Sequence, residues 1–479
     1  MIKRLVQNLS RTLCGMGVLI FVGVAQAQDK PNIVLLYADD LGYADLSIYG
    51  NEYHQTPNID SLMKAGMRFT QAYSPAALCA PSRVGLLSGR YPARFGVYEV
   101  VVGVKARGKP LDELPMVQPD NELRLPADNN TLGELLKAAG YRCGMFGKWH
   151  VGREKPSQRG FDDFVMLRNG GHLDVKMSYL RQSGDYPEPS GYSSDYISLC
   201  ADQFLDKNDD RPFFLYLPHT LVHTAMGPGT KPLEPKEELK NKYKALKPSK
   251  LHGNPLYAGM VEALDQSVGA LNTSLKKGGL LKNTLIIFTS DNGGLLGGPS
   301  GKVENGLALG RYTSNYPLKL GKSTLWEGGI RIPLSVTWPG HIEAGSLNDA
   351  VVSQLDFLPT LMEVAGGGKA PGKPMDGQSL WPLLRGKTPS EQERKLFWHY
   401  PGYRIYKDVG QRPASAVRWG DWKLVESLED GSVQLFDLKN DISEQQDVAQ
   451  KHPEHTGRLR KALAKWRSDT NAPLPTPRK

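Results

Sequence analysis

The sequence predicts an α/β fold with a large, mixed but mostly parallel sheet sandwiched by helices, and a small C-terminal antiparallel sheet with one helix. Short apolar runs rich in β-branched residues alternate with amphipathic helical segments up to about residue 390. Such alternation is typical of parallel sheets that are covered on both faces. Beyond that point, short strand patterns follow one another through tight turns, which indicates a separate antiparallel unit.

Apolar runs give the expected strands of the large sheet, and helical patterns lie between them. The runs are residues 32–38, 141–146, 212–217, 284–290 and 333–338. The amphipathic segments are clearest at residues 131–139, 257–271 and 355–365. Because ligands of parallel sheets bind at the carboxyl ends of the strands, we expect the functional site at that edge.

The C-terminal unit has its own pattern of short strands, at residues 397–400, 415–418, 422–427 and 432–437. A helical pattern at residues 453–467 and a proline-rich tail follow them. We therefore assign residues 28–390 to the main domain and residues 391–479 to a C-terminal α+β subdomain.

Residues 1–27 have the pattern of a secretory signal peptide. Three basic residues flank or precede an apolar run at residues 13–24, and an A-x-A cleavage site ends at Ala27. An N-terminal membrane anchor is the alternative, but the run is short for a membrane span. We expect cleavage after Ala27, export to the periplasm or the medium, and no membrane attachment of the mature chain.

The composition is that of a folded globular protein with a modest excess of basic residues. The 479 residues are 40% hydrophobic and 23% charged, and the formal net charge is +9. Cleavage after Ala27 removes Lys3, Arg4 and Arg11 and leaves 56 − 50 = +6, a modest excess that is compatible with a polyanionic substrate but does not indicate one. No basic block interleaved with aromatic residues is present, so we expect no nucleic-acid partner. The sequence leaves the oligomeric state open.

Cysteines are few after loss of the signal peptide: Cys79, Cys143 and Cys200. In an oxidising compartment Cys143 and Cys200 either form a disulfide or are small buried side chains, and the sequence leaves both open. Cys79 shortly precedes Pro81, a residue type favoured in the first turn of a helix. We therefore place Cys79 at a helix N-terminus, where backbone N–H groups favour anions.

Two polar pairs follow two of the predicted strands. Asp39 and Asp40 end the first strand, and Asp291 and Asn292 end the fourth. Either pair alone would more often cap a helix or form a turn. Two pairs at the same edge of a sheet favour a metal site, and their hard oxygen ligands suit Ca²⁺, or Mg²⁺, better than zinc.

The segment around Cys79 carries a recognisable signature. Cys79-Ala80-Pro81-Ser82-Arg83, with Leu-Leu-Ser-Gly-Arg at residues 86–90, resembles the signature of the type I, formylglycine-dependent sulfatases. The resemblance implies an α/β fold of the sulfatase/alkaline-phosphatase type. It also implies that a formylglycine-generating maturase oxidises Cys79 to formylglycine, whose hydrated aldehyde is the nucleophile.

The resemblance extends over residues 31–467 and implies roles for further residues. Segments 147–150, 218–224, 290–294 and 321–329 match other family motifs. The implied catalytic residues are Cys79, Arg83, Lys148, His150, His223 and Lys322, of which Lys148, His223 and Lys322 also bind the sulfate. The implied metal ligands are Asp39, Asp40, Cys79 after its oxidation, Asp291 and Asn292. Ala225 stands where relatives often have proline, so His219 remains an alternative to His223.

The chemistry of a sulfate ester fits these residue types. The ester is an anion, so a nucleophile reaches its sulfur only where cations surround the oxygens. A divalent metal, Arg83, Lys148 and Lys322 would supply that field, and His150 and His223 would transfer protons near neutral pH. We therefore predict an exported, calcium-dependent sulfuric ester hydrolase whose substrate is a sulfated carbohydrate, either a small molecule or an oligosaccharide.

Two other functions remain open from the sequence. A phosphate or phosphonate ester hydrolase on the same fold is the first, because phosphate and sulfate have similar shapes. A non-catalytic binder of sulfated glycans, with Cys79 never converted, is the second. The sequence does not identify the sugar, the sulfated position or endo against exo action, and we expect the loops at residues 169–172 and 404–412 to decide these.

Overall fold

The computed structural model describes residues 30–478 apart from residues 101–112, 169–170, 178, 208, 227–228, 368–373, 388–393 and 407–408. The predicted signal peptide, residues 1–27, and the predicted domain boundary after residue 390 both lie outside the described residues. Both therefore stay predictions. Among the described residues, no helix is both long enough and apolar enough to cross a membrane.

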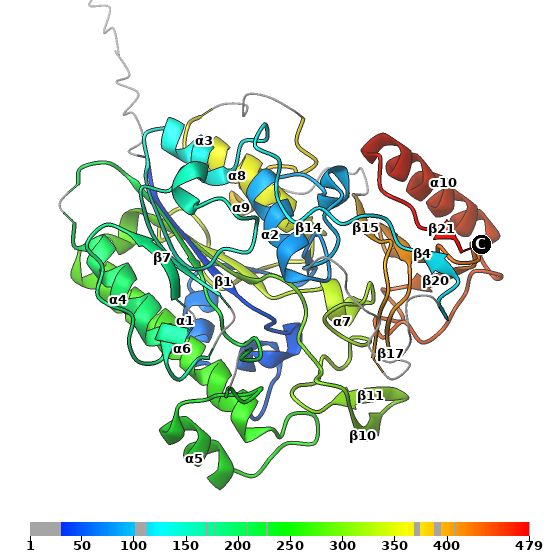
Figure 1. The fold of residues 1–479 in the computed structure, drawn as a ribbon, viewed down its shortest axis with the longest axis horizontal. Helices are drawn as coiled ribbons and strands as arrows, with labels where there is room; N and C mark the ends of the chain where they lie inside the picture. Colours follow the sequence, from blue (N-terminus) through cyan, green and yellow to red (C-terminus); the bar gives the residue numbers. More distant parts are fainter. Residues whose placement is uncertain are drawn as a thin grey trace, which may run out of the picture. The chain divides into compact units, whose positions relative to one another are not determined.

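A mixed sheet forms the centre of the fold, with nine strands in the described residues, in the order β13-β2-β12-β9-β1-β8-β5-β6-β7 (Figure 1). Its core β9-β1-β8-β5-β6 is parallel throughout, which confirms the predicted fold class. The strands are β1 (Asn32–Ala38), β2 (Met67–Phe69), β5 (Arg142–Lys148), β6 (Asp163–Leu167), β7 (Tyr179–Ser183), β8 (Phe213–Pro218), β9 (Thr284–Ser290), β12 (Leu334–Thr337) and β13 (Ser346–Asn348).

Strand β12 does not share the parallel direction of the central strands. It runs antiparallel to both of its neighbours, β9 and β2. The chain leaves β9 at the carboxyl edge of the sheet, and helix α7 (Glu327–Ile330) leads into β12 from that same edge. Leu334 therefore lies opposite Thr289, near the end of β9. The sequence pattern of a buried strand carries no sign of its direction, because both faces are apolar in either case.

Helices cover both faces of the sheet, and alternation along β1 shows how. Ile33 and Leu35 belong to one buried cluster, while Val34 and Leu36 belong to the other. Figure 1 shows the helices of the two layers on opposite sides of the sheet. The first layer contains α2 (Cys79–Ser88), α3 (Leu132–Ala138), α8 (Phe357–Val364) and α9 (Trp381–Leu384); the second contains α1 (Pro57–Lys64), α4 (Ser193–Leu205) and α6 (Pro255–Lys277).

The three described cysteines are unpaired and buried. Cys143, on β5, packs in the cluster of the first layer, whereas Cys200, on α4, packs in that of the second. The two therefore lie on opposite faces of the sheet, and a disulfide between them is excluded by this geometry.

The C-terminal unit contains a four-stranded antiparallel sheet in the order β15-β18-β19-β20. Its strands are β15 (Lys395–Tyr400), β18 (Ala414–Trp419), β19 (Trp422–Ser427) and β20 (Val433–Asp437). Helix α10 (Pro453–Thr470) packs Leu459 and Leu463 against Val417 and Leu424 of this sheet. The predicted antiparallel sheet with one helix is confirmed, and the helix is one turn longer than its sequence pattern suggests.

Short elements complete the described structure. They are α5 (Glu237–Ala245), the hairpins β10–β11 (Pro299–Glu304, Leu307–Gly310) and β16–β17 (Arg404–Tyr406, Val409–Gln411), and the pairs β3–β14 (Ala72–Tyr73, Val352–Ser353) and β4–β21 (Met116–Val117, Thr476–Pro477).

A buried ion network joins the C-terminal sheet to α7. The Lys423 ammonium lies 3.0 Å from Glu327 and 2.7 Å from Glu444, and all three side chains are fully buried. Glu327 also accepts a hydrogen bond from Tyr73 at 2.7 Å. Because α7 begins a few residues after Lys322, this network fixes the segment that carries a candidate site residue.

We expect Lys423→Met to lower the free energy of unfolding by about 3–5 kcal/mol, because it leaves two buried carboxylates without their shared cation. Urea unfolding of the variant and the wild type measures the difference. Lys451→Met, at an exposed lysine, is the matched control. A loss no larger than that of the control would contradict the structural role of the network.

Candidate active site

The predicted polar pairs lie side by side at the carboxyl edge of the sheet. Strands β1 and β9 are parallel neighbours with Ala38 opposite Ser290, so the residues that follow them emerge together. The Asp40 N–H donates to Asp291 Oδ1 at 3.0 Å, which ties the two strand ends together. The sequence thus brings these carboxylates into one place through strand pairing alone.

Two residues at this edge have left-handed backbone conformations although neither is glycine. Asp40 has φ 63° and His150 has φ 58°. Such conformations cost about 1–3 kcal/mol each and persist where the surroundings enforce them, which is common at functional sites.

Three cations and three carboxylates face one another in the buried centre of the site. Arg83 donates twice to Asp291 Oδ2, from Nη2 at 2.8 Å and from Nε at 3.2 Å. Lys148, the last residue of β5, donates to Asp39 at 2.7 Å. With Lys322, the structure assembles residues from five separate parts of the chain.

Lys322 reaches the same cluster from a long loop. Its ammonium lies 2.7 Å from Asp40 Oδ1 and 3.3 Å from Cys79 Sγ. The loop is held by the Lys322 N–H, which donates to the Gly294 carbonyl at 3.0 Å. Gly293 has no room for a side chain, since a Cβ there would come within 1.8 Å of the Gly328 carbonyl oxygen. This close approach seats the loop against the end of β9.

The local charges set the acidity of the carboxylates. Burial tends to raise the pKa of Asp40, but Lys322, His223 and Lys148 outweigh it and hold the pKa well below its usual range. Burial and the neighbouring Asp39 raise the pKa of Asp291 to about 6, although Arg83 acts in the opposite sense. One added positive charge would therefore favour the ionised form of Asp291.

Cys79 is the first residue of α2, as predicted, and its side chain is buried. Burial raises the pKa of the Cys79 thiol to about 12, although Lys148 and Lys322 act to lower it. Cysteines that react as thiolates have lowered pKa values. In this setting Cys79 is a neutral thiol, and an unmodified Cys79 is a poor nucleophile.

The site has features that suit a hard cation. Asp39 Oδ1 and Asn292 Oδ1 are buried and have no hydrogen-bond partner among the described residues. Asp39, Asp40, Cys79 and His223 each offer one ligand atom, and these atoms lie within 4.8 Å of one another. Unsatisfied buried oxygens are costly, and carboxylate and amide oxygens are the ligands that Ca²⁺ prefers. The oxygens of Asp39, Asp40 and Asn292 therefore fit calcium, whereas the Cys79 sulfur and the His223 nitrogen do not.

The structure separates the two candidate histidines. His223 Nε2 lies 3.7 Å from Asp40 Oδ2, and its Nδ1 pairs with the Thr224 carbonyl at 2.7 Å, so Nε2 faces the cluster. His219 is buried as well, but neither of its ring nitrogens has a hydrogen-bond or ion-pair partner among the described residues. The geometry thus favours His223 over His219.

Comparison with known proteins identifies the family. Residues 31–367 match the family model described as "Sulfatase", and residues 320–469 match one described as "N-sulphoglucosamine sulphohydrolase, C-terminal". The chain belongs to the sulfatase family. It is accordingly a sulfuric ester hydrolase.

Relatives of this sulfatase cover most of its length. A sulfatase from Formosa agariphila is 32% identical, over 93% of this chain and 90% of the relative. Human arylsulfatase A is 33% identical, over 84% of this chain and 75% of the relative. The crystal structure of Ps i-CgsB in complex with k-i-k-neocarrahexaose is 32% identical with a TM-score of 0.75, and the match covers 91% of this chain and 93% of that one.

Sequence reasoning gave no role to Asp45, which anchors the loop that carries Asp40 in this sulfatase. Asp45 accepts hydrogen bonds from the Gly42 N–H at 2.7 Å, from Tyr257 at 2.7 Å and from Thr313. The Tyr257 hydroxyl also lies 3.4 Å from the Asp40 carbonyl. A single acidic residue in a loop has no distinctive sequence signal, so only its contacts reveal this role.

The two loops expected to contact substrate are described in part, since residues 169–170 and 407–408 lie outside the described residues. His172 Nε2 pairs with the His223 carbonyl at 2.8 Å, so this loop supports the histidine segment. Gln411 accepts a hydrogen bond from the Leu325 N–H at 2.8 Å, so the β16–β17 hairpin of the C-terminal unit contacts the loop of Lys322.

Proposed function

We propose that this sulfatase removes sulfate from a sulfated carbohydrate, with a formylglycine made from Cys79 and a bound Ca²⁺. The likeness to Ps i-CgsB, which was crystallised with a neocarrahexaose, carries the substrate class. We further propose that the chain is exported after cleavage behind Ala27, and that residues 28–390 form the catalytic domain and residues 391–479 a subdomain.

The surroundings of Cys79 support its conversion by a formylglycine-generating maturase. A neutral Cys79 thiol is a poor nucleophile although it lies beside the Lys322 ammonium. The signature at residues 79–83 is also complete. When formed, the hydrated aldehyde supplies a hydroxyl nucleophile. Lys322 Nζ is placed to hold and polarise groups at this position, since it already lies 3.3 Å from the sulfur.

The metal ligands in this proposal are Asp39, Asp40, Asp291, Asn292 and the oxidised residue 79, with Mg²⁺ as an alternative to Ca²⁺. The ion would supply positive charge that offsets the negative charge of the ester. Its binding would also change the partners of the lysines. Lys148 and Lys322 now neutralise Asp39 and Asp40, and a cation on those carboxylates would leave both ammonium groups to bind sulfate oxygens.

Arg83 and the histidines have different tasks in the proposal. Arg83 stays paired with Asp291 through two hydrogen bonds and fixes the orientation of that carboxylate. Burial and the cations near it, first Lys322, lower the pKa of His223, and a bound sulfate ester would act in the opposite sense. We assign His223 as the proton donor to the leaving oxygen and His150 as the base on the residue 79 side.

We expect His223→Ala to lower kcat by about 10²–10⁴-fold on sulfated sugars, the range of a lost general acid. Aryl sulfates should suffer less, because a phenolate leaves without protonation more readily than an alkoxide does. His219→Ala is the matched control and should keep most of its activity. A dead His219→Ala beside an active His223→Ala would reverse the assignment.

A substrate panel tests the proposed function as a whole. Enzyme produced together with a formylglycine-generating maturase is incubated with sulfated mono- and oligosaccharides and with matched phosphate esters, and free sulfate or phosphate is measured. We expect sulfate release from at least one sulfated sugar. Faster phosphate release would support the phosphoesterase alternative, and release of neither anion by a protein with an intact thiol at Cys79 would support the binder.

A further inference from the structure

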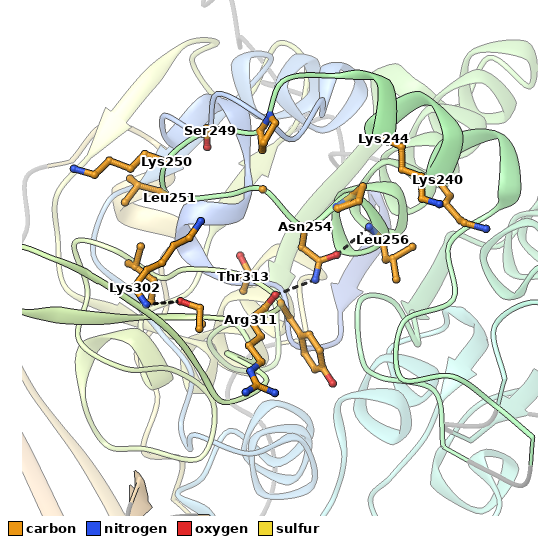
Figure 2. A pocket seen from close by; sticks show the side chains of 17 residues that line it. Lys240, Lys244, Ser249, Lys250, Leu251, Asn254, Leu256, Lys302, Arg311 and Thr313 are labelled. Atoms are coloured by element: carbon orange, nitrogen blue, oxygen red, sulfur yellow. Dashed lines mark hydrogen bonds between the residues drawn. The ribbon is translucent and has the colours of Figure 1, made fainter.

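A basic cavity lies outside the catalytic cluster, between α5, the start of α6 and the β10–β11 hairpin. It encloses about 690 Å³. Its charged lining residues, among those the structure describes, are all cations: Lys240, Lys244, Lys250, Lys302 and Arg311. Figure 2 shows the two lysines of α5 on one side of it and Lys250 and Lys302 on the other. A cavity with cations on opposing walls attracts an anion that carries more than one charge.

The positive charge of the cavity is only partly compensated. Lys240 pairs with Glu237 at 2.8 Å and Lys250 pairs with Glu304 at 2.5 Å. The Glu237 side chain is 68% exposed and that of Lys250 is 74% exposed, so both pairs are weak and open to exchange with another anion. Lys244 and Lys302 are exposed, and in the described part of the chain neither has an ion-pair partner within 4.0 Å.

The lining also offers contacts for a sugar. Tyr312, Leu256 and Leu309 contribute apolar surface, and Ser300 contributes a hydroxyl group. The Asn254 amide is held within the protein, because it accepts from the Leu256 N–H and donates to the Arg311 carbonyl (Figure 2). A tyrosine ring beside a hydroxyl group gives a ligand ring both an apolar and a polar contact, and the surrounding lysines provide for the sulfate groups of a sulfated sugar.

The cavity wall is connected to the loop that carries Asp40. Thr313, which lines the cavity, donates to Asp45, and Tyr257, which follows the lining residue Leu256, donates to the same carboxylate at 2.7 Å. The cavity wall and the loop of Asp40 therefore share the Asp45 carboxylate as a hydrogen-bond acceptor.

We propose that this cavity is a second binding site for a sulfated oligosaccharide, which it holds by sulfate groups other than the one that is hydrolysed. The proposal rests on the proposed carbohydrate specificity. A polymeric substrate that engages both sites gains affinity through its second contact, because that contact is made at high effective concentration. A small aryl sulfate reaches only the catalytic cluster and gains nothing.

Binding and turnover are measured separately, so that this proposal and the proposed function fail in different ways. Fluorescent dextran sulfate is titrated into Cys79→Ala protein with and without Lys244→Gln and Lys302→Gln. Loss of these two charges should weaken binding about fivefold. Unsulfated dextran should not bind, and added salt should reduce the difference between the two proteins. Lys276→Gln with Lys277→Gln, at the exposed end of α6, is the matched control.

In the active enzyme, the same two substitutions should leave kcat/KM for 4-nitrophenyl sulfate unchanged and raise KM for a sulfated oligosaccharide that the substrate panel identifies. Lys244→Glu with Lys302→Glu should increase the effect on dextran sulfate binding. The proposal would be overturned if Cys79→Ala protein bound dextran sulfate with equal affinity whether residues 244 and 302 were lysine, glutamine or glutamate. A loss no greater than that of the control pair would also overturn it.

Discussion

Replacing Cys79 by serine is expected to lower kcat for 4-nitrophenyl sulfate by about 10³-fold or more, in a host whose maturase acts on cysteine. A serine has one hydroxyl group, whereas the hydrated aldehyde has two. When one hydroxyl of the hydrated aldehyde carries the sulfate, the other can lose its proton, so that the aldehyde re-forms and sulfate is eliminated; serine has no such second hydroxyl. Cys79 Sγ lies 3.3 Å from Lys322 Nζ, so the hydroxyl of the variant would occupy the same position without the same chemistry.

Controls separate lost chemistry from lost structure. Cys143→Ser changes another buried cysteine, outside the candidate site, and should keep activity in proportion to the folded fraction. The melting temperature of the Cys79 variant should stay near that of the wild type, because the side chains differ by one atom. Peptide mass across residue 79 of the wild type should show the aldehyde. A fully active Cys79→Ser enzyme, or a wild type with an intact thiol and full activity, would exclude the formylglycine proposal.

Removal of the metal is expected to have the second largest effect. Chelation should abolish sulfate release. If free Ca²⁺ is initially present at 100 times its Kd, chelation should also lower the free energy of unfolding by about 3 kcal/mol. The reason is the buried oxygens of Asp39 and Asn292, which have no hydrogen-bond partner among the described residues and which a cation would satisfy. Calcium should restore both properties, and magnesium should restore them in part.

A substitution at the site identifies the ligands. Asp39→Asn removes one charge with little change of shape, so its melting temperature should respond much less to added calcium. Asp265→Asn is the matched control, because Asp265 is also a buried aspartate but accepts hydrogen bonds from Ile59 and Asn58. Equal calcium responses in the two variants, or a wild type whose activity and melting temperature ignore chelation, would contradict the metal assignment.

The sequence determined the elements that place the site. The bounds of β1 and β9 agree with their apolar runs, residues 32–38 and 284–290, because a strand buried on both faces leaves a continuous signal. The polar residues that follow them, Asp39 and Asp291, interrupt that signal sharply. The helix start at Cys79 is equally local, since Pro81 favours the first turn. These features depend on neighbours in sequence, which is why they could be predicted.

Tertiary structure alone decided how the histidines, Lys322 and the other two cysteines are placed around these strand ends. His223 and His219 lie four residues apart with similar local sequence, and only packing turns His223 towards Asp40. The position of Lys322 depends on the close approach of Gly293 to Gly328. The opposite faces of Cys143 and Cys200 follow likewise from sheet packing.

The basic cavity shows the same division. Its cations come from α5, from the chain before α6, from β10 and from the residue that follows β11, and none of these segments carries a motif. Local sequence indicates secondary-structure propensity and which residues are buried. A site made of segments that are distant in sequence forms only when tertiary contacts bring those segments together. The sequence therefore determined the strand ends and the signature, and the tertiary structure decided which charges pair, which histidine faces the site and where a second anion can bind.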